Sequence, residues 1–260
     1  MSTLNAQGIG VSAGKKVILT DVGFQAHAGA LTAIVGPNGS GKSTLLKALT
    51  GEIKASGTAD INGLDIHTAA PERLAEVRAV LPQSTPMSFP FQVLEVVRLG
   101  LRYRGEGSDE AALEAIRQVG LQGYEARFYQ ELSGGEQQRT QLARVLAQVW
   151  SPFEAVEPKW LFLDEPVASL DIAHQLEVMT LARDFADAGG GVLAVMHDLN
   201  LSAMFADKVL VMKDGRLVAD GPVRETLTDA LLSRVYGCRV QSCAPPGAQE
   251  WYVLPHLSRA

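Results

Sequence analysis

The sequence has very little cysteine: Cys238 and Cys243 are the two such residues in a chain of 260. Two thiols cannot form a framework of several disulfides or a zinc site with four cysteine ligands, and so low a content is typical of a cytosolic protein. No apolar run approaches the ~20 residues that a membrane-spanning helix requires. The first residues, MSTLNAQGIG, lack the basic and then apolar segments of a secretory signal. We therefore expect any membrane role to arise through a partner.

Basic residues are also in deficit. The chain has 23 Lys and Arg against 29 Asp and Glu, a formal net charge of -6. This balance argues against a broad nucleic-acid surface, which needs a positive field, so we expect no nucleic-acid partner. Contents of 47% hydrophobic and 20% charged residues exclude a disordered chain. The length suits one large domain, or a core with a subdomain.

Short apolar runs alternate with helical patterns along most of the chain. The pattern predicts short strands over 15–35 with turns at Gly23 and at 27–29, hairpins at 62–63 and 214–215, and buried strands at 160–166 and 192–198. It predicts helices over 71–78, 133–149, 172–187 and 199–206, and a loop over 151–158. Strands that alternate with helices indicate an α/β fold with a largely parallel sheet.

The middle of the chain is different, because residues 91–129 have a mostly helical pattern. We expect a helical subdomain over 84–159, inserted into a sheet-containing core formed by 1–83 and 160–240, with a C-terminal tail over 241–260.

A glycine-rich stretch lies between an apolar strand and a helix and fits the pattern G-x-x-x-x-G-K-[ST], which in that context is a phosphate-binding loop. Glycines let the backbone approach phosphate oxygens, and amides at the helix start point at the anion. Lys42 would place its charge on the β- and γ-phosphates, and Ser43 would ligate Mg²⁺. The predicted nucleotide contacts are Gly36, Pro37, Asn38, Gly39, Ser40, Gly41, Lys42, Ser43 and Thr44.

Two carboxylates follow the buried strand that begins at Trp160. Asp164 and Glu165 come at its carboxyl end, the edge where ligands bind in open α/β sheets. We expect Asp164 to hold Mg²⁺, directly or through water, and Glu165 to act as general base on the attacking water.

A second helix start carries a serine and two glycines, in the stretch LSGGEQQR over 132–139. Its bare amides would form another anion cradle. One compact subunit cannot use both cradles on a single nucleotide. We therefore expect a head-to-tail homodimer in which Ser133, Gly134 and Gly135 of each chain cap the nucleotide held by the other chain's loop.

At this point the chain resembles the ATP-binding cassette (ABC) ATPases over nearly its whole length, and LSGGEQQR is similar to their signature motif. The resemblance implies a P-loop NTPase fold with a RecA-like core, an antiparallel β-subdomain and an inserted α-helical subdomain. It implies roles for Gln83 as the Q-loop glutamine that senses metal and water, and for Asp171, in Ser169-Leu170-Asp171, as the D-loop aspartate that orders the partner's phosphate loop. His197 resembles the switch histidine that bonds the γ-phosphate.

The chain departs from that family at the place of the aromatic residue that stacks on adenine, where it has Ala13. We assign no stacking residue and expect adenine packing that is either weaker or made by apolar groups such as Val11 and Val17.

Three stretches, at 79–100, 142–166 and 192–212, resemble the ATPases of hemin importers, within the siderophore, cobalamin and heme branch. The second contains the insertion SPFEAVE. The resemblance implies an ATPase at the cytoplasmic face of a bacterial inner membrane, working with two transmembrane permease subunits and, indirectly, with a periplasmic heme-binding protein. Import of ferric siderophores or cobalamin is the alternative within transport. A soluble ABC ATPase of DNA repair or translation, and a P-loop kinase or GTPase, are alternatives outside it; the last does not account for LSGGEQQR.

Overall fold

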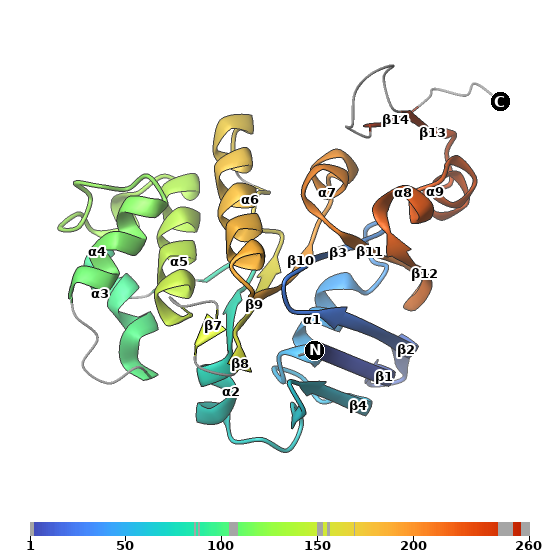
Figure 1. Cartoon of the computed structure of the whole chain (residues 1–260), viewed down its shortest axis with the longest axis horizontal. Coiled ribbons are helices and arrows are strands. Elements are labelled where there is room, and N and C mark those ends of the chain that lie inside the picture. Colours follow the sequence, from blue (N-terminus) through green and yellow to red (C-terminus); the bar gives the residue numbers. More distant parts are fainter. Residues whose placement is uncertain are drawn as a thin grey trace.

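The chain folds around two sheets, a six-stranded one at the centre and a four-stranded antiparallel one beside it (Figure 1). The computed structural model describes residues 3–85, 87, 89–103, 109–149, 153–154, 157–168, 170–243 and 252–255. This mixture of sheets and helices agrees with the predicted α/β class.

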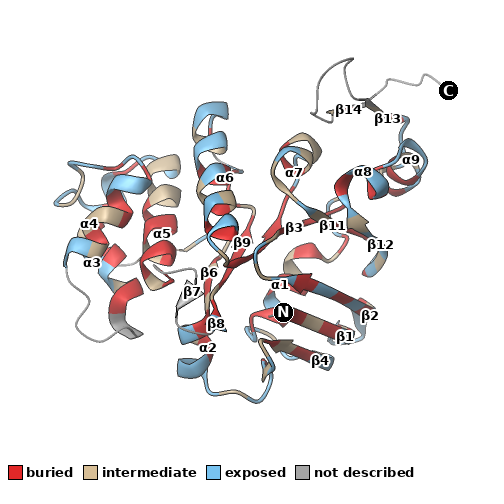
Figure 2. Cartoon of the chain, viewed as in Figure 1, coloured by how far each residue is buried: buried red, intermediate tan, exposed pale blue. Residues whose placement is uncertain are grey.

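The central sheet has the strand order β12-β11-β3-β10-β9-β6. All neighbours in it run parallel except β11 and β12, which form the predicted hairpin at 214–215. Its strands are β3 (Leu31–Val35), β6 (Arg78–Leu81), β9 (Trp160–Asp164), β10 (Gly191–Val195), β11 (Lys208–Lys213) and β12 (Arg216–Pro222). Every residue of β3, β9 and β10 is buried, as expected of parallel strands covered on both faces (Figure 2).

The antiparallel sheet has the order β2-β1-β4-β5, and its strands are β1 (Thr3–Ala13), β2 (Lys16–His27), β4 (Ser56–Ile61) and β5 (Leu64–Asp65). The hairpin predicted at 62–63 joins β4 to β5. The turn predicted at Gly23 is wrong, because β2 continues through it. A side chain at Gly23 would lie 3.4 Å from the Ala6 carbonyl oxygen of β1, an ordinary van der Waals contact, so nothing interrupts the strand there.

In the part of the chain that the structure describes, six helices accompany the sheets: α1 (Lys42–Leu49), α2 (Pro71–Val77), α6 (Ile172–Asp187), α7 (Leu199–Phe205), α8 (Val223–Thr226) and α9 (Asp229–Tyr236). The segment between β6 and β9 contributes α3 (Val93–Arg98), α4 (Asp109–Gln118) and α5 (Gly134–Gln148), with short 3-10 turns at Leu99–Tyr103 and Tyr129–Glu131. The four predicted helices are confirmed within a residue or so at each end. In Figure 1, α3, α4 and α5 lie together on one side of the molecule.

The loop predicted over 151–158 is wrong in part, because two short strands, β7 (Phe153–Glu154) and β8 (Glu157–Pro158), pair there. The rest of that insertion lies outside the described residues. In the tail, β13 (Val240–Cys243) pairs with β14 (Tyr252–Pro255). The amide of Val253 donates to Oδ1 of Asn200 at 2.7 Å, which attaches this hairpin to α7.

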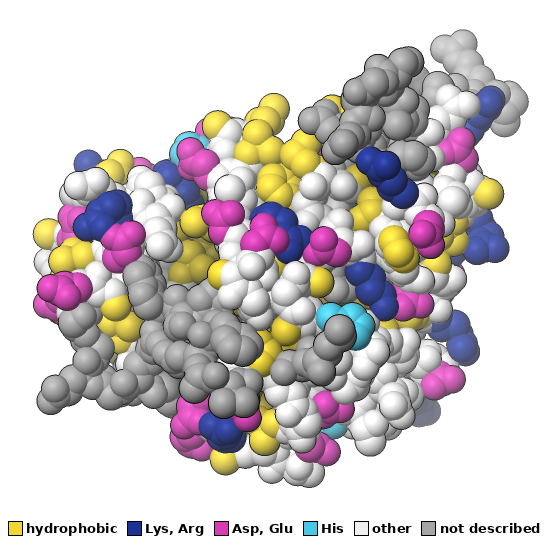
Figure 3. Space-filling view, in the orientation of Figure 1, with side chains coloured by type: hydrophobic (Ala, Val, Ile, Leu, Met, Phe, Trp, Pro, Cys, Tyr) yellow, Lys and Arg dark blue, Asp and Glu magenta, His cyan; other side chains and the backbone are white. Residues whose placement is uncertain are grey.

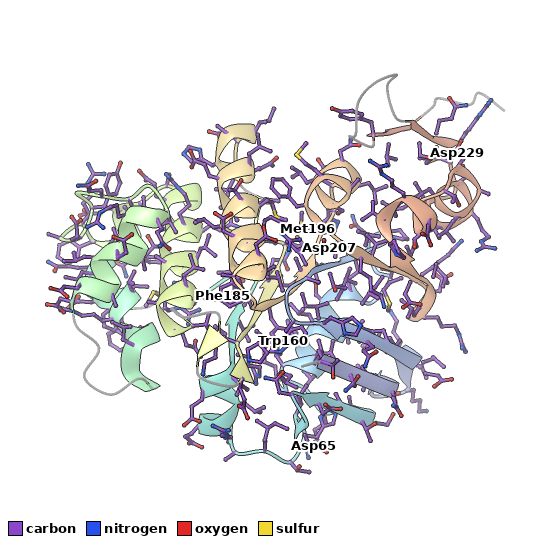
Figure 4. The ribbon with its side chains drawn as sticks, in the orientation of Figure 1. Asp65, Trp160, Phe185, Met196, Asp207 and Asp229 are labelled. Carbon is purple, nitrogen blue, oxygen red and sulfur yellow. The ribbon has the colours of Figure 1, made fainter. Side chains whose placement is uncertain are left out.

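The side chains of β9 contribute to two hydrophobic clusters, one on each face of the central sheet. Trp160 and Phe162 pack on the face toward the antiparallel sheet, and Leu161 and Leu163 pack on the face toward α5 and α6. This alternation is the period of two of a strand. The Trp160 ring, labelled in Figure 4, also donates from Nε1 to Oδ1 of Asn62 at 3.1 Å. The sheet that carries the predicted site is thus anchored from both faces.

Within the described residues, none of the helices is both long and apolar enough to cross a membrane. Acidic and basic side chains are interspersed over the face of the molecule seen in Figure 3.

Candidate active site

Four neighbouring strands deliver the predicted site residues to one edge of the central sheet. In the register of the sheet, Leu81 pairs with Leu163, Asp164 with Val195, and Val195 with Ile34. Gln83 and Glu165 therefore each lie two residues beyond the Leu81–Leu163 pair. His197 and Gly36 each lie two residues beyond the Val195–Ile34 pair. Segments far apart in the sequence meet because parallel strands end at the same edge.

The glycine-rich stretch forms a tight loop between β3 and α1. Gly36 has φ 150, and a side chain there would lie 2.2 Å from the Met212 carbonyl oxygen. Gly41 is the N-cap of α1 with φ 99 and makes no side-chain cap, so the amides of the first turn face outward as an anion site. Any larger residue at either position would deform the loop.

Lys42 is 5% exposed and points back over the loop. Its Nζ donates to the carbonyl of Gly36 at 2.9 Å and of Pro37 at 3.2 Å. Burial lowers the pKa of Lys42, while the nearby Glu165 and Asp164 carboxylates act in the opposite direction. The ammonium group is thus held at the mouth of the loop.

Ser43 and Asp164 meet across the site, where Oγ of Ser43 donates to Oδ1 of Asp164 at 2.9 Å. Asp164 is 2% exposed, and this burial raises its pKa, although the hydrogen bond from Ser43 lowers it. A hydroxyl and a carboxylate are oxygen ligands of the kind that Mg²⁺ prefers, so the residues present fit this ion.

Glu165 is held from two sides. Its Oε2 accepts from Nε2 of Gln83 at 2.8 Å, and its Oε1 lies 2.5 Å from Nε2 of His197. The backbone of Glu165 has φ 53, a left-handed conformation that costs free energy in a residue with a side chain. Such strain at the end of a buried strand is common at functional sites.

One pocket of about 410 Å³ brings these groups together. It is lined by Asn38, Gly39, Gly41, Lys42, Ser43, Thr44, Gln83, Glu165 and His197. All nine are residues that the sequence singled out. Of the other predicted residues of the loop, Gly36 and Ser40 are buried, and Pro37 is half-buried.

The signature residues do not line this pocket. Ser133 caps α5 in a capping box with Glu136: its Oγ accepts from the Glu136 amide at 3.3 Å, and its own amide donates to Glu136 at 2.8 Å. The expectation that the amides of this helix start are bare is therefore wrong for Ser133 and Glu136. Ser133 and Gly134 are exposed and Gly135 is half-buried.

Asp171 also lies outside the pocket. Its Oδ1 accepts from the amide of His174 at 3.0 Å, which makes it the N-cap of α6, and this bond lowers its pKa. Ser169, before it, lies outside the described residues.

Ala13 is exposed at the tip of the β1–β2 hairpin, where it pairs with Lys16. Val17 is 60% exposed and offers an apolar surface there, whereas Val11 is 7% exposed and belongs to the core. The expectation that Val11 packs against adenine is therefore unsupported by its position.

Sequence reasoning missed Gln138. Its Nε2 donates to the carbonyl of Glu165 at 3.2 Å and of Pro166 at 2.5 Å. Its place in LSGGEQQR gives no chemical signal of this contact, since the partner is fixed by tertiary packing.

Residues 19–168, more than half of the chain, match the model of the ABC transporter family. The chain belongs to this family. Over 99% of its length it is 58% identical to the whole of a hemin import ATP-binding protein from Ruegeria sp. (strain TM1040). It superposes on an inward-facing putative metal-chelate type ABC transporter with a TM-score of 0.80 at 23% identity, over 98% of each chain, which shows the fold. It also superposes on a bacterial ABC transporter cassette solved as a dimer, with a TM-score of 0.74 at 26% identity, over 85% of this chain and 99% of the other.

Proposed function

We propose that this chain is the ATP-hydrolysing subunit of a bacterial ABC importer and that it drives uptake of hemin across the inner membrane. The observation that carries the ATPase activity is the single pocket in which Lys42, Ser43, Gln83, Glu165 and His197 converge. The hemin assignment is supported by the identity of 58% over nearly the full length to a relative of that name.

The chain's own residues divide the work in this proposal. The loop from Gly36 to Thr44 binds the phosphates of ATP, and Lys42 places a positive charge beside the transferred group. Ser43, Gln83 and Asp164 would hold magnesium. When bound, this ion supplies charge neutralisation on the phosphates.

Glu165 is the general base, because its carboxylate is the acidic group that faces the pocket at the end of β9. It accepts the proton of the attacking water, and His197 stabilises the negative charge of the γ-phosphate. In the described arrangement both carboxylate oxygens of Glu165 are already engaged, by Gln83 and by His197. Catalysis thus requires at least one of these bonds to yield to water.

A homodimer completes the site in this proposal. Ser133, Gly134 and Gly135 lie at an exposed helix start outside the pocket of their own chain, which leaves them accessible to the nucleotide of a partner. Asp171 would order the partner's loop from the start of α6. We propose the boundaries 1–83 and 160–240 for the core, 84–159 for the helical subdomain and 241–260 for the tail.

Two transmembrane permease subunits would bind the helical subdomain on the cytoplasmic face of the membrane. Apolar side chains support this location: Phe89 is 70% exposed, Phe128 is 42% exposed, and the ring of Phe91 lies 6.2 Å from that of Phe89. A periplasmic heme-binding protein would act only through the permease.

The composite site is tested by mixing two inactive variants. Lys42→Ala removes the loop cation, and Ser133→Arg blocks the signature serine. Each variant alone should hydrolyse ATP at background rates, while a mixture should regain activity, because a mixed dimer has one intact site. Ser133→Arg alone should still bind ATP as a monomer. A mixture as inactive as its components would refute the cross-subunit site.

The substrate is tested with the ATPase and its permease reconstituted in vesicles. Heme-loaded binding protein should stimulate ATP hydrolysis. Stimulation by a binding protein loaded with ferric siderophore or cobalamin, and none by heme, would instead assign the chain to that other branch of importers.

A further inference from the structure

We propose that Gln138 is a positioning residue that ties the start of the signature helix to the backbone of the general base in the same chain. The proposal rests on the function given above. The contact that carries it is the pair of hydrogen bonds from the Gln138 amide to the consecutive carbonyls of Glu165 and Pro166, at 3.2 and 2.5 Å.

The backbone at Glu165 needs such support. Its left-handed conformation, with φ 53, persists only when the surroundings hold it in place. The amide of Glu165 donates to the Val195 carbonyl at 3.2 Å, and its carbonyl accepts from the Ala168 amide at 3.3 Å as well as from Gln138. Since proline has no N–H, the Pro166 carbonyl is the polar backbone group through which that residue can be fixed.

The bond joins two elements that are remote in the sequence. Gln138 lies in the second turn of α5, five residues after Ser133, which is roughly 7 Å along the helix axis. Because a helix start held by a capping box is stiff, a shift of Ser133 moves Gln138 with it. Engagement of Ser133–Gly135 by a partner's nucleotide would thus move the backbone of Glu165.

Three separate segments consequently meet at Glu165. Gln83, after β6, and His197, after β10, contact its carboxylate, whereas Gln138 contacts its backbone. Gln83 and His197 determine the hydrogen bonds of the carboxylate. Gln138 fixes the position of the backbone from which the Glu165 side chain extends.

The neighbouring Gln137 provides a matched control. It also donates from Nε2 to two backbone carbonyls, those of Tyr129 at 3.2 Å and Leu132 at 3.1 Å. Both acceptors belong to the segment before α5, so this glutamine makes the same number of bonds without reaching Glu165.

The test measures ATP hydrolysis by the full chain carrying Gln138→Ala, Gln138→Glu or Gln137→Ala. Gln138→Glu keeps the shape of the side chain and removes both donors. We expect either change at Gln138 to lower kcat about tenfold or more, since small misplacements of a catalytic group have effects of that size, with KM and ATP affinity within about threefold. Gln137→Ala should have a much smaller effect on kcat. Thermal unfolding identifies any variant that loses activity through loss of the fold.

The decisive comparison uses the Glu165→Gln background under single-turnover conditions. There Gln138→Ala should cause no further loss, because a residue that acts through Glu165 has nothing left to position. An equal loss in both backgrounds, a kcat at the wild-type level, or equal effects of Gln137→Ala and Gln138→Ala would overturn the proposal. If Glu165→Gln itself hydrolyses ATP normally, the proposed base is wrong instead, and that result is distinct from a failure at Gln138.

Discussion

His197 and Glu165 contact each other from two adjacent strand ends, with Nε2 of His197 at 2.5 Å from Oε1 of Glu165. The side chain of His197 is 42% exposed and that of Glu165 is 13% exposed. The Glu165 carboxyl group is therefore the more buried partner of the pair, and His197 is the more exposed one. In the proposed mechanism, a γ-phosphate bound to His197 would compete with this contact, and the competition would link arrival of the substrate to release of the base.

Replacement of Glu165 by Gln should lower the rate of ATP hydrolysis by about 10²-fold or more, in line with the usual contribution of a general base. The amide keeps the size of the side chain but cannot accept the proton of the water. ATP binding should remain, so an ATP-bound dimer should accumulate on size exclusion. Glu177→Gln, an exposed change on α6, is the control. Equal rates of ATP hydrolysis in wild type and Glu165→Gln would show that Glu165 is not the general base.

Lys42→Ala should abolish measurable ATP binding, because the ammonium that now bonds the carbonyls of Gly36 and Pro37 is the buried cation at the loop. Titration with a fluorescent ATP analogue measures the loss. Lys54→Ala, at an exposed position beyond α1, should bind normally. Retained affinity in Lys42→Ala would show that the phosphates bind elsewhere.

Asp164→Asn should stabilise the nucleotide-free protein while impairing magnesium-dependent hydrolysis. Burial raises the pKa of Asp164, so the folded state takes up its proton more readily than the unfolded chain, and stability is lost as the pH rises through that pKa. The neutral amide escapes this cost and can still accept from Ser43. We expect a rise in Tm of roughly 2–4 °C at pH 7, a change of about 1 kcal/mol in a chain of this size.

The pH dependence supplies the check on that prediction. The difference in Tm should shrink below about pH 4, the ordinary range of an aspartate, because both side chains are then uncharged. If the difference in Tm between Asp164→Asn and wild type does not vary with pH, the gain in stability comes from packing and not from removal of the charge.

Ala13→Tyr should strengthen ATP binding about three- to tenfold, the range expected when one aromatic ring stacks on another. The hairpin tip is exposed, so the new ring displaces no core residue. Affinity for inorganic triphosphate, which has no base, should stay unchanged. Lys15→Tyr, at the same turn, controls for a general effect of an aromatic residue. If triphosphate affinity rises equally, the tyrosine acts without stacking on adenine.

Much of the site could be predicted because its chemistry is encoded locally. The glycine loop is one contiguous stretch of sequence, and so is the Asp164–Glu165 pair. Parallel strands bring these two stretches to the same edge of the sheet, whatever sequence lies between them. The capping box of Ser133 and Glu136 is also encoded locally, as the pattern S-x-x-E, and that pattern implies that two amides of the helix start already have partners.

Other features depended on tertiary contacts that no local pattern contains. The strand β1 escaped prediction because bulges near Gly8 and Gly10 interrupt its alternation. Gly23 suggests a turn by its residue type, although it lies within β2, opposite the irregular part of β1. Gln138 is an ordinary helical glutamine until the fold places the loop after β9 against it.

The contacts of Lys42 have a consequence for how nucleotide enters. Two carbonyls of the loop hold this side chain in place, so binding of a triphosphate requires Lys42 to exchange hydrogen-bond partners and requires no folding of a segment. Association should therefore be rapid, and the heat-capacity change of binding should be small. A loop that became ordered only when its ligand binds would show the opposite.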